Sequence, residues 1–193
     1  ILSPGMVYDP ATIDESSTNY LCAYDSKTLS FLETTTGEAF YYRIKSEAER
    51  TRLMKVLRPK ELLIFEKDRE SFFQNKDLDG PYLSVFEEGE SYNEAWPESA
   101  NRLLSYAIYM QGEELSSLIK HFEERGLERR MELPATVMRH LEVFENYRGE
   151  TNGTLFSSIK RTKSSAGTRL LKQWLRFPLT ETQEISQRHN EID

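Results

Sequence analysis

The chain has 193 residues, a formal net charge of −7, a hydrophobic fraction of 38% and an aromatic fraction of 11%. This length allows one large domain or two small ones, and the mixed charges with abundant aromatic residues argue against a disordered protein. The single cysteine, Cys22, excludes an internal disulfide and a cysteine-rich zinc site, as is typical of the reducing cytoplasm. No apolar run reaches the roughly 18 residues that a membrane span requires, so no membrane partner is expected. The chain begins at Ile1 rather than at methionine and stops at Asp193 within a predicted helix, so we expect a piece of a larger protein.

The first part of the chain has the pattern of short strands. Residues 1–17 are polar and turn-forming and predict a loop. Strand-forming runs follow at residues 19–25, 28–35 and 39–44, with a Thr-Gly-Glu turn before the third run. Three short strands with tight turns predict an antiparallel meander.

The periodicity then changes to a mixture of helices and strands. Ser46 is a candidate N-cap for a helix that buries Leu53, Met54 and Leu57 and ends at Pro59. Residues 61–66 form an apolar run typical of a strand buried on both faces. A short helix is predicted at residues 68–73 and a fifth strand at residues 82–86. The order predicts an α/β layered domain that ends near residue 108.

From Pro97 onward the sequence predicts helices almost throughout. Apolar residues keep helical spacing as far as Phe122, with a break at Gly112. A connection at residues 126–131 precedes a helix at residues 135–144, whose predicted buried residues are Val137, Leu141 and Phe144. A loop at residues 149–153, a short helix containing Phe156 and Ile159, and a capping box at residues 180–183 complete the pattern. The fold class is therefore α/β followed by an incomplete all-helical segment, residues 109–193.

The stretch at residues 155–179 combines an apolar face with a local excess of positive charge. Ser164 or Ser165 can cap its helix and Pro178 ends it. Helical spacing places five apolar residues on one face: Ala166, Leu170, Leu171, Trp174 and Leu175. Six basic residues occur without an acidic residue between Glu150 and Glu181: Lys160, Arg161, Lys163, Arg169, Lys172 and Arg176. Because Trp174 shares the apolar face, we expect it to pack in a core rather than to stack on bases.

Carboxylates at strand ends are candidates for a metal or acid–base site. The predicted positions are Asp25, Glu33, Glu66 and Asp68. A meander followed by α/β/α elements resembles the ribonuclease H arrangement, in which clustered carboxylates hold metal ions for phosphodiester cleavage. In a chain with 32 acidic residues such positions also arise by chance, and we favour solvation of the strand ends.

Other chemistry is not indicated by the sequence. The histidines, His121, His140 and His189, are far apart, and none has a second ligand at metal-binding spacing. The glycines form no phosphate-binding loop, and the serines near residue 157 and residue 164 lack a nucleophile-elbow pattern. Cys22 lies within a predicted strand and is expected to be a small core residue. No metal, catalytic or cofactor-binding residue is predicted.

The segment at residues 161–179 resembles the DNA mismatch repair protein family MutS, whose members carry R-T-x-T-x-x-G-x-R-L-L-x-x-W-L-x-x-P-L. The residues that carry this resemblance are Arg161, Thr162, Gly167, Arg169, Leu170, Leu171, Trp174, Leu175 and Pro178. Residues 141–155 resemble the family's L-E-[ILV]…E-N-x-R-G…T-L run, and residues 3–63 resemble its connector domain. Pro134 and Lys160 stand where many members have Asp, and Ser164 replaces Thr. We draw no loss of function from these departures.

The resemblance implies a division of the chain and a mechanical role. Residues 1–108 would be the ribonuclease H-like connector domain, and residues 109–193 would be the first part of the helical core, or lever, domain. The family's mismatch-reading Phe-x-Glu motif would precede this piece, and its ATP-binding Walker motifs, with ATP and Mg²⁺, would follow it. The piece would therefore be non-catalytic, without a cofactor of its own. It would join the two ends of a dimeric parent that binds mismatched duplex DNA, contact other MutS domains and offer a docking surface for MutL.

Two other functions follow from the residues themselves. One is a metal-dependent nuclease on the ribonuclease H-like domain. The other is a DNA-binding module that uses the basic run at residues 160–176, because lysine and arginine supply the salt-dependent part of nucleic-acid binding. The predicted phosphate or interdomain contacts are Lys160, Arg161, Lys163, Lys172 and Arg176. We favour contacts within the protein for this basic face.

Overall fold

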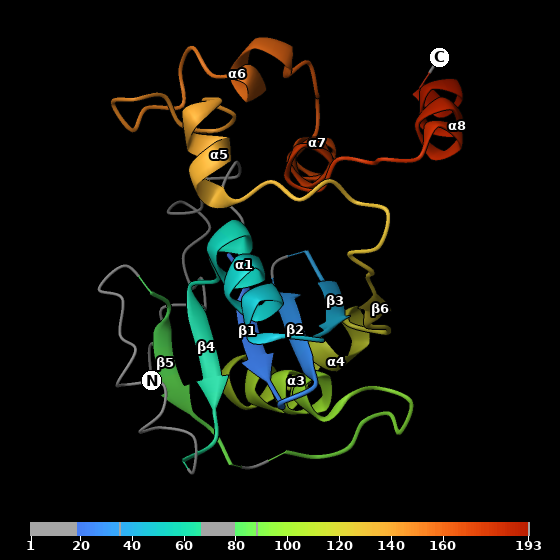
Figure 1. Cartoon of the computed structure of the whole chain (residues 1–193). Coiled ribbons are helices and arrows are strands. Elements are labelled where there is room, and N and C mark those ends of the chain that lie inside the picture. The colour runs from blue at the N-terminus through green and yellow to red at the C-terminus, as the bar shows by residue number, and fades with distance from the viewer. Residues whose placement is uncertain (1–18, 35, 67–79, 88, 193) are drawn as a thin grey trace. The chain divides into compact units, whose positions relative to one another are not determined.

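The computed structural model describes residues 19–34, 36–66, 80–87 and 89–192. The chain forms two compact units, Ile1–Gly126 and Leu127–Asp193. The first unit is a mixed sheet with helices, and the second contains helices joined by long loops, which agrees with the predicted order of α/β followed by all-α (Figure 1). Among the described residues, no helix has both the length and the apolar composition to cross a membrane.

The sheet of the first unit has six strands in the order β5-β4-β1-β2-β3-β6. The predicted meander is confirmed, since β1 pairs antiparallel with β2 and β2 pairs antiparallel with β3. The other three strands join by parallel pairing, β4 to β1, β5 to β4 and β6 to β3. The strands are β1 (Leu21–Tyr24), β2 (Thr28–Glu33), β3 (Glu38–Arg43), β4 (Glu61–Ile64), β5 (Tyr82–Val85) and β6 (Glu123–Glu124).

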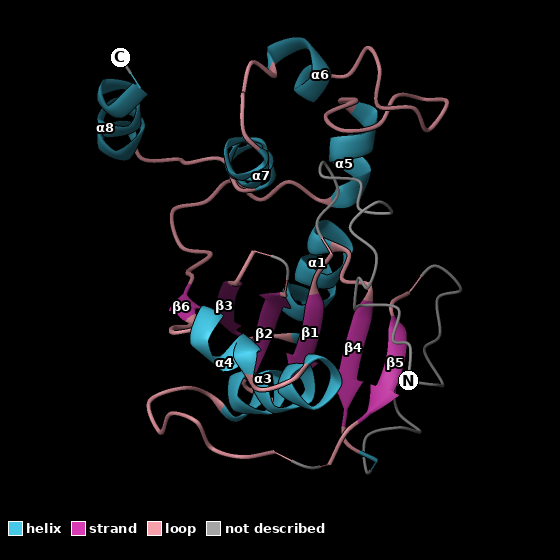
Figure 2. Cartoon of the chain, turned by 180° about the vertical axis from the view of Figure 1, so that it is seen from behind, coloured by secondary structure: helices cyan, strands magenta, loops and turns pink. Residues whose placement is uncertain are grey.

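Helices cover both faces of this sheet. The helix α1 (Glu47–Leu57) lies on one face, and α3 (Glu98–Gln111) and α4 (Glu114–Leu118) lie on the other (Figure 2). Ser46 caps α1 as predicted, because its hydroxyl accepts the backbone N–H of Glu49 at 3.2 Å. The helix α1 ends at Arg58, which takes the left-handed conformation just before Pro59.

Alternate residues of the strands supply two apolar layers, as expected for a sheet covered on both faces. On the α3 face the core includes Leu21, Leu63, Leu103 and Leu104, which are at most 2% exposed. On the other face, Cys22 meets Met54 of α1 with a sulfur–sulfur distance of 4.0 Å. Cys22 is therefore a buried core residue, as predicted. The same face carries an aromatic cluster whose ring centroids lie 5.3–6.3 Å apart, formed by Tyr20, Phe31, Phe40 and Tyr42.

The second unit contains α5 (Ala135–His140), α6 (Leu155–Ile159), α7 (Ser165–Arg176) and α8 (Thr182–Ile192). Two segments outside the helices pair with each other. The backbone N–H of Met131 donates to the carbonyl of Pro178 at 2.7 Å, and that of Thr180 donates to the carbonyl of Arg129 at 3.1 Å. The helix α7 begins after Ser164 and ends at Arg176, so the predicted cap and the predicted stop before Pro178 are both confirmed.

Two helix predictions were wrong. The helical pattern predicted as far as Phe122 ends at Leu118, because Ile119 and Phe122 are buried in the core of the first unit and the next two residues form β6. The helix predicted at residues 135–144 ends at His140, because Glu142 has a positive φ of 48° and the chain turns to pair with α6. That turn buries Met138 and Val143 and leaves the predicted core residues Val137 and Leu141 exposed.

The boundary between the two compact units differs from the predicted domain boundary. They divide at Gly126 rather than near residue 108, because α3 and α4 pack with the sheet and β6 belongs to it. The division at residue 108 concerns the family's domains and stays a prediction. The loop predicted at residues 1–17 and the helix predicted at residues 68–73 lie outside the described residues.

Candidate functional site

Asp25, the first of the carboxylates considered as metal ligands, is a structural hydrogen-bond acceptor. Its Oδ1 accepts the backbone N–H groups of Lys27 at 3.1 Å and Thr28 at 2.8 Å. Its Oδ2 accepts the Thr28 hydroxyl at 2.6 Å and the backbone N–H of Ser99 at 2.9 Å. Ser99 lies in the first turn of α3, whose N-cap residue, Pro97, contributes no side-chain cap. Asp25 therefore caps a helix that lies far from it in the sequence.

The pKa of Asp25 reflects these contacts. Burial alone raises the pKa of its carboxyl, but hydrogen bonds from the Thr28 hydroxyl and from three backbone N–H groups outweigh that effect. The net pKa lies below the ordinary value of 3.8. The carboxylate is thus held ionised by donors that already occupy both oxygens, which leaves little capacity for a metal ion.

The other predicted carboxylates do not join Asp25. Glu33 is 4% exposed and accepts the hydroxyl of Thr36, while Glu66 is exposed beyond the end of β4. Asp68 lies outside the described residues. Within the described part of the chain, no three His, Cys, Asp or Glu side chains are grouped so that they could hold a metal ion. The structure therefore gives the nuclease hypothesis no assembled site among these residues.

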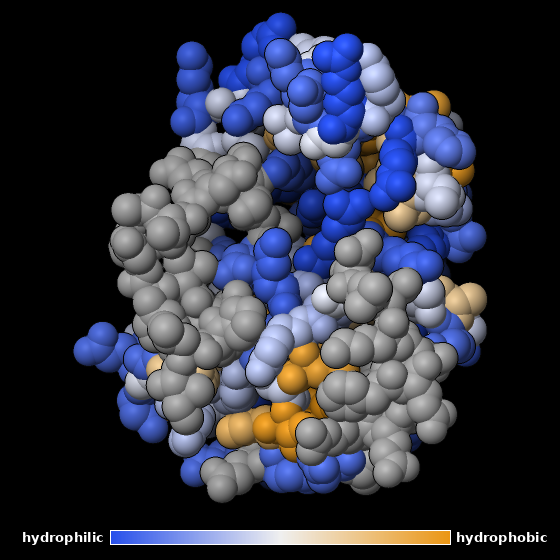
Figure 3. Space-filling view, turned by 90° about the vertical axis from the view of Figure 1, so that its left-hand side faces the viewer, coloured by the Kyte–Doolittle hydropathy of each residue, from blue (hydrophilic) through white to orange (hydrophobic). Residues whose placement is uncertain are grey.

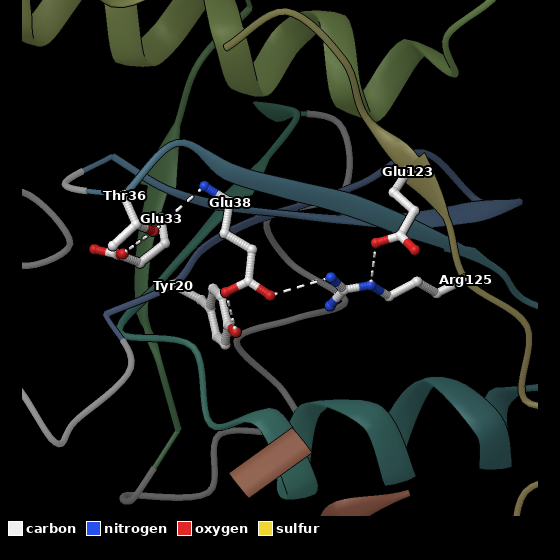
Figure 4. A network of polar contacts seen from close by, with 6 residues as sticks. All are labelled: Tyr20, Glu33, Thr36, Glu38, Glu123 and Arg125. Atoms are coloured by element: carbon white, nitrogen blue, oxygen red, sulfur yellow. Dashed lines mark hydrogen bonds and ion pairs between the residues drawn. The ribbon is translucent and has the colours of Figure 1, made fainter. Parts of the chain in front are cut away.

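A polar network that the sequence did not predict lies at the β3 edge of the sheet (Figure 4). Arg125 lies between two carboxylates, with Nη2 3.1 Å from Glu38 and Nε 2.7 Å from Glu123. Tyr20 donates its hydroxyl to the other oxygen of Glu38 at 2.9 Å. The guanidinium also lies over the ring of Phe40, with 3.8 Å between its carbon and the ring centroid. One cation therefore ties the segment that leaves the first unit to strand β3.

The charges in this network reinforce each other. Burial alone lowers the pKa of Arg125, but the hydrogen bond that it donates to Glu123 and the charges of Glu38 and Glu123 raise the pKa overall. Next to it, Glu124 accepts from Tyr41 at 2.8 Å and from Arg43 at 2.8 Å. The Arg43 and Tyr41 hydrogen bonds hold the pKa of Glu124 below its ordinary value. Both glutamates of β6 are thus paired with arginines.

The start of α7 explains why this stretch combines Thr, Ser and Gly. The Ser164 hydroxyl accepts the backbone N–H of Gly167 at 3.1 Å, which caps the helix. The hydroxyls of Thr162 and Thr168 lie 2.8 Å apart, and Thr168 is 5% exposed. A Cβ on Gly167 would lie 3.3 Å from the Ser164 hydroxyl and 3.5 Å from Thr162. These contacts give the motif residues a structural role in starting the helix.

The predicted basic contacts fall into two groups. Lys160, Arg161 and Lys163 are exposed before α7, and Arg161 Nη1 donates to the Lys160 carbonyl at 2.9 Å. Lys172 and Arg176 are half-buried in α7 and lie over aromatic rings, at 5.2 Å from the centroid of Phe156 and 5.3 Å from that of Phe144, respectively. These aromatic contacts within the protein agree with the favoured interpretation for Lys172 and Arg176.

The apolar face of α7 is less buried than predicted. Leu170 is 46% exposed, and Leu171, Trp174 and Leu175 are half-buried. Trp174 lies under the guanidinium of Arg188, 4.3 Å from its ring centroid. Arg169 is half-buried, and Pro178 follows the helix and accepts the bond from Met131. The unit as described therefore exposes part of the face that was expected to form a core.

The three histidines are exposed, in agreement with their interpretation as surface residues. Cys22 is buried, and burial raises the pKa of its thiol well above the ordinary value of 9.0, against a smaller opposite effect of Arg102. A protonated, buried thiol is a poor nucleophile. The three histidines and Cys22 therefore give no support for a metal site or a catalytic nucleophile.

Known proteins are similar to this chain over both of its units. Residues 136–193 match the family model described as MutS domain III. The DNA mismatch repair protein MutS of Thermus aquaticus is 32% identical over 202 residues, which cover 100% of this chain and 24% of that protein. The chain belongs to the MutS family. The MutS proteins of Macrococcus caseolyticus and Streptococcus thermophilus are 28% and 29% identical, each again over 100% of this chain and 24% of the relative.

These matches confirm the resemblance inferred from the sequence, and they connect the chain with DNA mismatch repair. The chain spans about a quarter of the length of the curated MutS relatives that it matches. The MutS domain III match includes the motif at residues 161–179 and the run at residues 141–155. The Arg125 network precedes this match and carries no short motif, which is why the sequence did not reveal it.

Proposed function

We propose that this chain is the connector domain and the first part of the helical core, or lever, of a MutS-family protein. In this role it joins the mismatch-binding end of the parent protein to its ATPase end and relays their state. The observation that carries the proposal is the match of the entire chain to about a quarter of each MutS relative, in a chain with an α/β unit followed by a helical unit. ATP and Mg²⁺ would be bound by other parts of the parent, and the site of action would be the cytoplasm.

The topology of the first unit supports a ribonuclease H-like connector. Its strands β3, β2 and β1 form an antiparallel meander, and β4 and β5 extend the sheet in parallel from β1. Helices lie on both faces. In this assignment the connector occupies residues 1–108, and the segment from residue 109 to Gly126 packs with it while leading into the lever.

The connector is proposed to be non-catalytic. The support is that Asp25 is saturated by hydrogen bonds and caps α3, so that the one predicted carboxylate at the end of β1 already has a structural role. The purified chain is then expected to show neither ATP hydrolysis nor Mg²⁺- or Mn²⁺-dependent cleavage of duplex or hybrid above background. Metal-dependent cleavage that is lost in Asp25→Asn and in Glu33→Gln, under conditions in which both variants remain folded, would replace this proposal with the nuclease function.

The partners of the chain would be other MutS domains, mismatched duplex DNA through the dimeric parent, and MutL. An exposed apolar edge supports MutL docking on the connector. Tyr82 and Val85 of β5 are 58% and 40% exposed, and an apolar patch is visible on this side of the molecule (Figure 3). Exposed apolar patches often mark protein interfaces. The exposed basic residues Lys160, Arg161 and Lys163 are proposed to contact other domains or phosphates.

A relay requires that movement at one end be transmitted through the joint between the two units. A flexible Gly-Gly-Ser insertion after Gly126 in the parent protein would loosen that joint without altering either end. We expect mismatch affinity and basal ATP hydrolysis to be retained, and the mismatch-dependent change in ATP turnover to fall at least about fivefold, the lower end of typical coupling. The control is the same insertion after Asn152, within a loop of the second unit. Equal coupling in both variants would refute the relay.

A further inference from the structure

The strand β6 is held to the sheet in an unusual way. It has only two residues, Glu123 and Glu124, and both are exposed. Glutamate is depleted in strands because it gains little from a pleated, half-buried surface. The strand nevertheless pairs in parallel with β3, opposite Phe40 and Tyr41. Since β6 buries no apolar side chain of its own, other interactions must keep it in place.

Those interactions are charges contributed by β3 and by the residue after β6. Arg125 contacts Glu38 at 3.1 Å and Glu123 at 2.7 Å, and its backbone N–H donates to the carbonyl of Tyr41 at 2.8 Å. Arg43 contacts Glu124 at 2.8 Å. Figure 4 shows the guanidinium of Arg125 directed between the two carboxylates that it bridges. These ion pairs add to the backbone pairing of β6 with β3, which the N–H of Arg125 extends by one further hydrogen bond.

The attached segment has clear boundaries. On one side, Phe122 is 1% exposed and its ring lies 5.1 Å from that of Trp96, so it is anchored by burial. On the other side, Gly126 is exposed and is the last residue of the first unit. Residues 123–126 can therefore leave the sheet while Phe122 stays buried, and the core contact that they lose is that of the Arg125 guanidinium with the ring of Phe40.

We propose that residues 123–126 form a detachable latch, which controls how freely the second unit moves relative to the first. When the latch is closed, the joint between the units starts after Arg125. When it is open, the joint starts after Phe122 and gains three residues, which span up to about 11 Å when extended. This device is a property of the chain itself and does not depend on its role in mismatch repair.

Physical considerations favour a latch that opens locally. Exposed ion pairs such as Arg43–Glu124, whose side chains are 65% and 49% exposed, contribute little and are screened by salt. The Arg125–Glu38 pair is more buried, at 15% and 24% exposed, and is therefore the main contact. In the open state water solvates Arg125, while Glu38 keeps its bond from Tyr20. Segments with few buried apolar contacts open without global unfolding.

Amide hydrogen exchange on the intact chain tests the latch. Glu38→Gln keeps the shape of the side chain and removes its charge, so the exchange of the Arg125 amide should accelerate about tenfold, the effect of losing about 1.4 kcal/mol of closing free energy. Amides that pair β1 with β2 should be unaffected. Glu47→Gln, which removes the exposed ion pair with Arg50, is the matched control and should leave the Arg125 amide unchanged.

Two further measurements make the outcome decisive. In the unmodified chain, raising the NaCl concentration should accelerate exchange at Arg125 before it affects β1, which tests the latch without any substitution. Nitroxide labels at Lys55→Cys and Ser186→Cys, both exposed positions, should report a broader distance distribution in Glu38→Gln than in Glu47→Gln; the buried Cys22 stays unlabelled. Exchange at Arg125 that always parallels β1, or distance distributions that coincide, would overturn the latch.

Discussion

Replacing Asp25 with Asn distinguishes the structural role of this residue from a catalytic one. In the folded protein, Oδ1 accepts two backbone N–H groups, and Oδ2 accepts the Thr28 hydroxyl and the Ser99 N–H. An asparagine can keep the two bonds at Oδ1, but its amide then points N–H groups at the N–H of Ser99. The opposite orientation is worse, because it faces the two N–H donors of Lys27 and Thr28.

The size of the effect follows from these contacts. A hydrogen bond to a charged group contributes about 1.5–3 kcal/mol, and a negative charge at a helix N-terminus adds about 0.3–1 kcal/mol. Asp25 is half-buried, which places the first contribution toward its lower end. The Thr28 hydroxyl keeps Ser99 Oγ as a partner at 2.7 Å, so its loss adds little. We therefore expect Asp25→Asn to destabilise the first unit by about 2–3 kcal/mol.

Urea unfolding measures this change in the first unit. Trp96 lies in that unit against Phe122, whereas Trp174 lies in the second, so a Trp174→Phe background lets Trp96 fluorescence report the first unit alone. Glu66→Gln is the control, because Glu66 is an exposed carboxylate at another strand end and its change should stay within about 0.5 kcal/mol. A stability loss for Asp25→Asn as small as that of the control would refute the capping role.

The same variant should change the response to acid. Because the pKa of Asp25 is lowered in the folded protein, its carboxylate stabilises the first unit at a pH above its ordinary pKa of 3.8. That stabilisation is lost as the pH falls through the lower, folded pKa. Glu124 has a lowered pKa and contributes in the same direction. Below about pH 5, the free energy of unfolding should depend less steeply on pH in Asp25→Asn than in the unsubstituted chain.

Three other predictions concern separate parts of the chain. Ser164→Ala should destabilise the second unit by about 1 kcal/mol in urea unfolding followed by Trp174 fluorescence, and Ser164→Asp should restore the loss; equal midpoints would refute the cap. Cys22, being buried, should react with an aromatic disulfide reagent only as fast as the first unit opens, so rapid labelling of the native chain would contradict its placement. Neutralising Lys160 should lower the salt dependence of any duplex binding, whereas Lys172→Gln, whose ammonium lies over a ring, should not; equal slopes would exclude a phosphate contact.

Local signals in the sequence predicted most of the fold because they act over a few residues. Ser46 and Ser164 cap helices within three residues, and Gly112 ends α3 with a positive φ of 104°. The strand runs are bounded by turns in the same way. The strand β6 escaped prediction because its two glutamates have no strand preference, and its pairing depends on a partner more than 80 residues away.

The sequence indicated which acidic residues lie at strand ends, but it did not indicate what those residues do. An acidic residue at a strand end looks the same in sequence whether it binds a metal or caps a distant helix. For Asp25 a signal did exist, since Pro97 cannot cap α3 with a side chain and the helix needs an acceptor from elsewhere. For the predicted apolar face of α7, helical spacing did not reveal the degree of burial, since Leu170 is 46% exposed and Leu171 and Trp174 are only half-buried.

The distribution of charge limits which unit of this chain can approach DNA. Residues 1–126 contain 14 Lys or Arg and 23 Asp or Glu, a net charge of −9, whereas residues 127–193 contain 11 and 9, a net charge of +2. A polyanion is repelled by the first unit at distances below the Debye length, about 8 Å at physiological salt. Within the second unit, Lys172 and Arg176 are already over aromatic rings. Any phosphate contact that this chain makes is therefore expected on the exposed basic residues of the second unit, among them Lys160, Arg161 and Lys163.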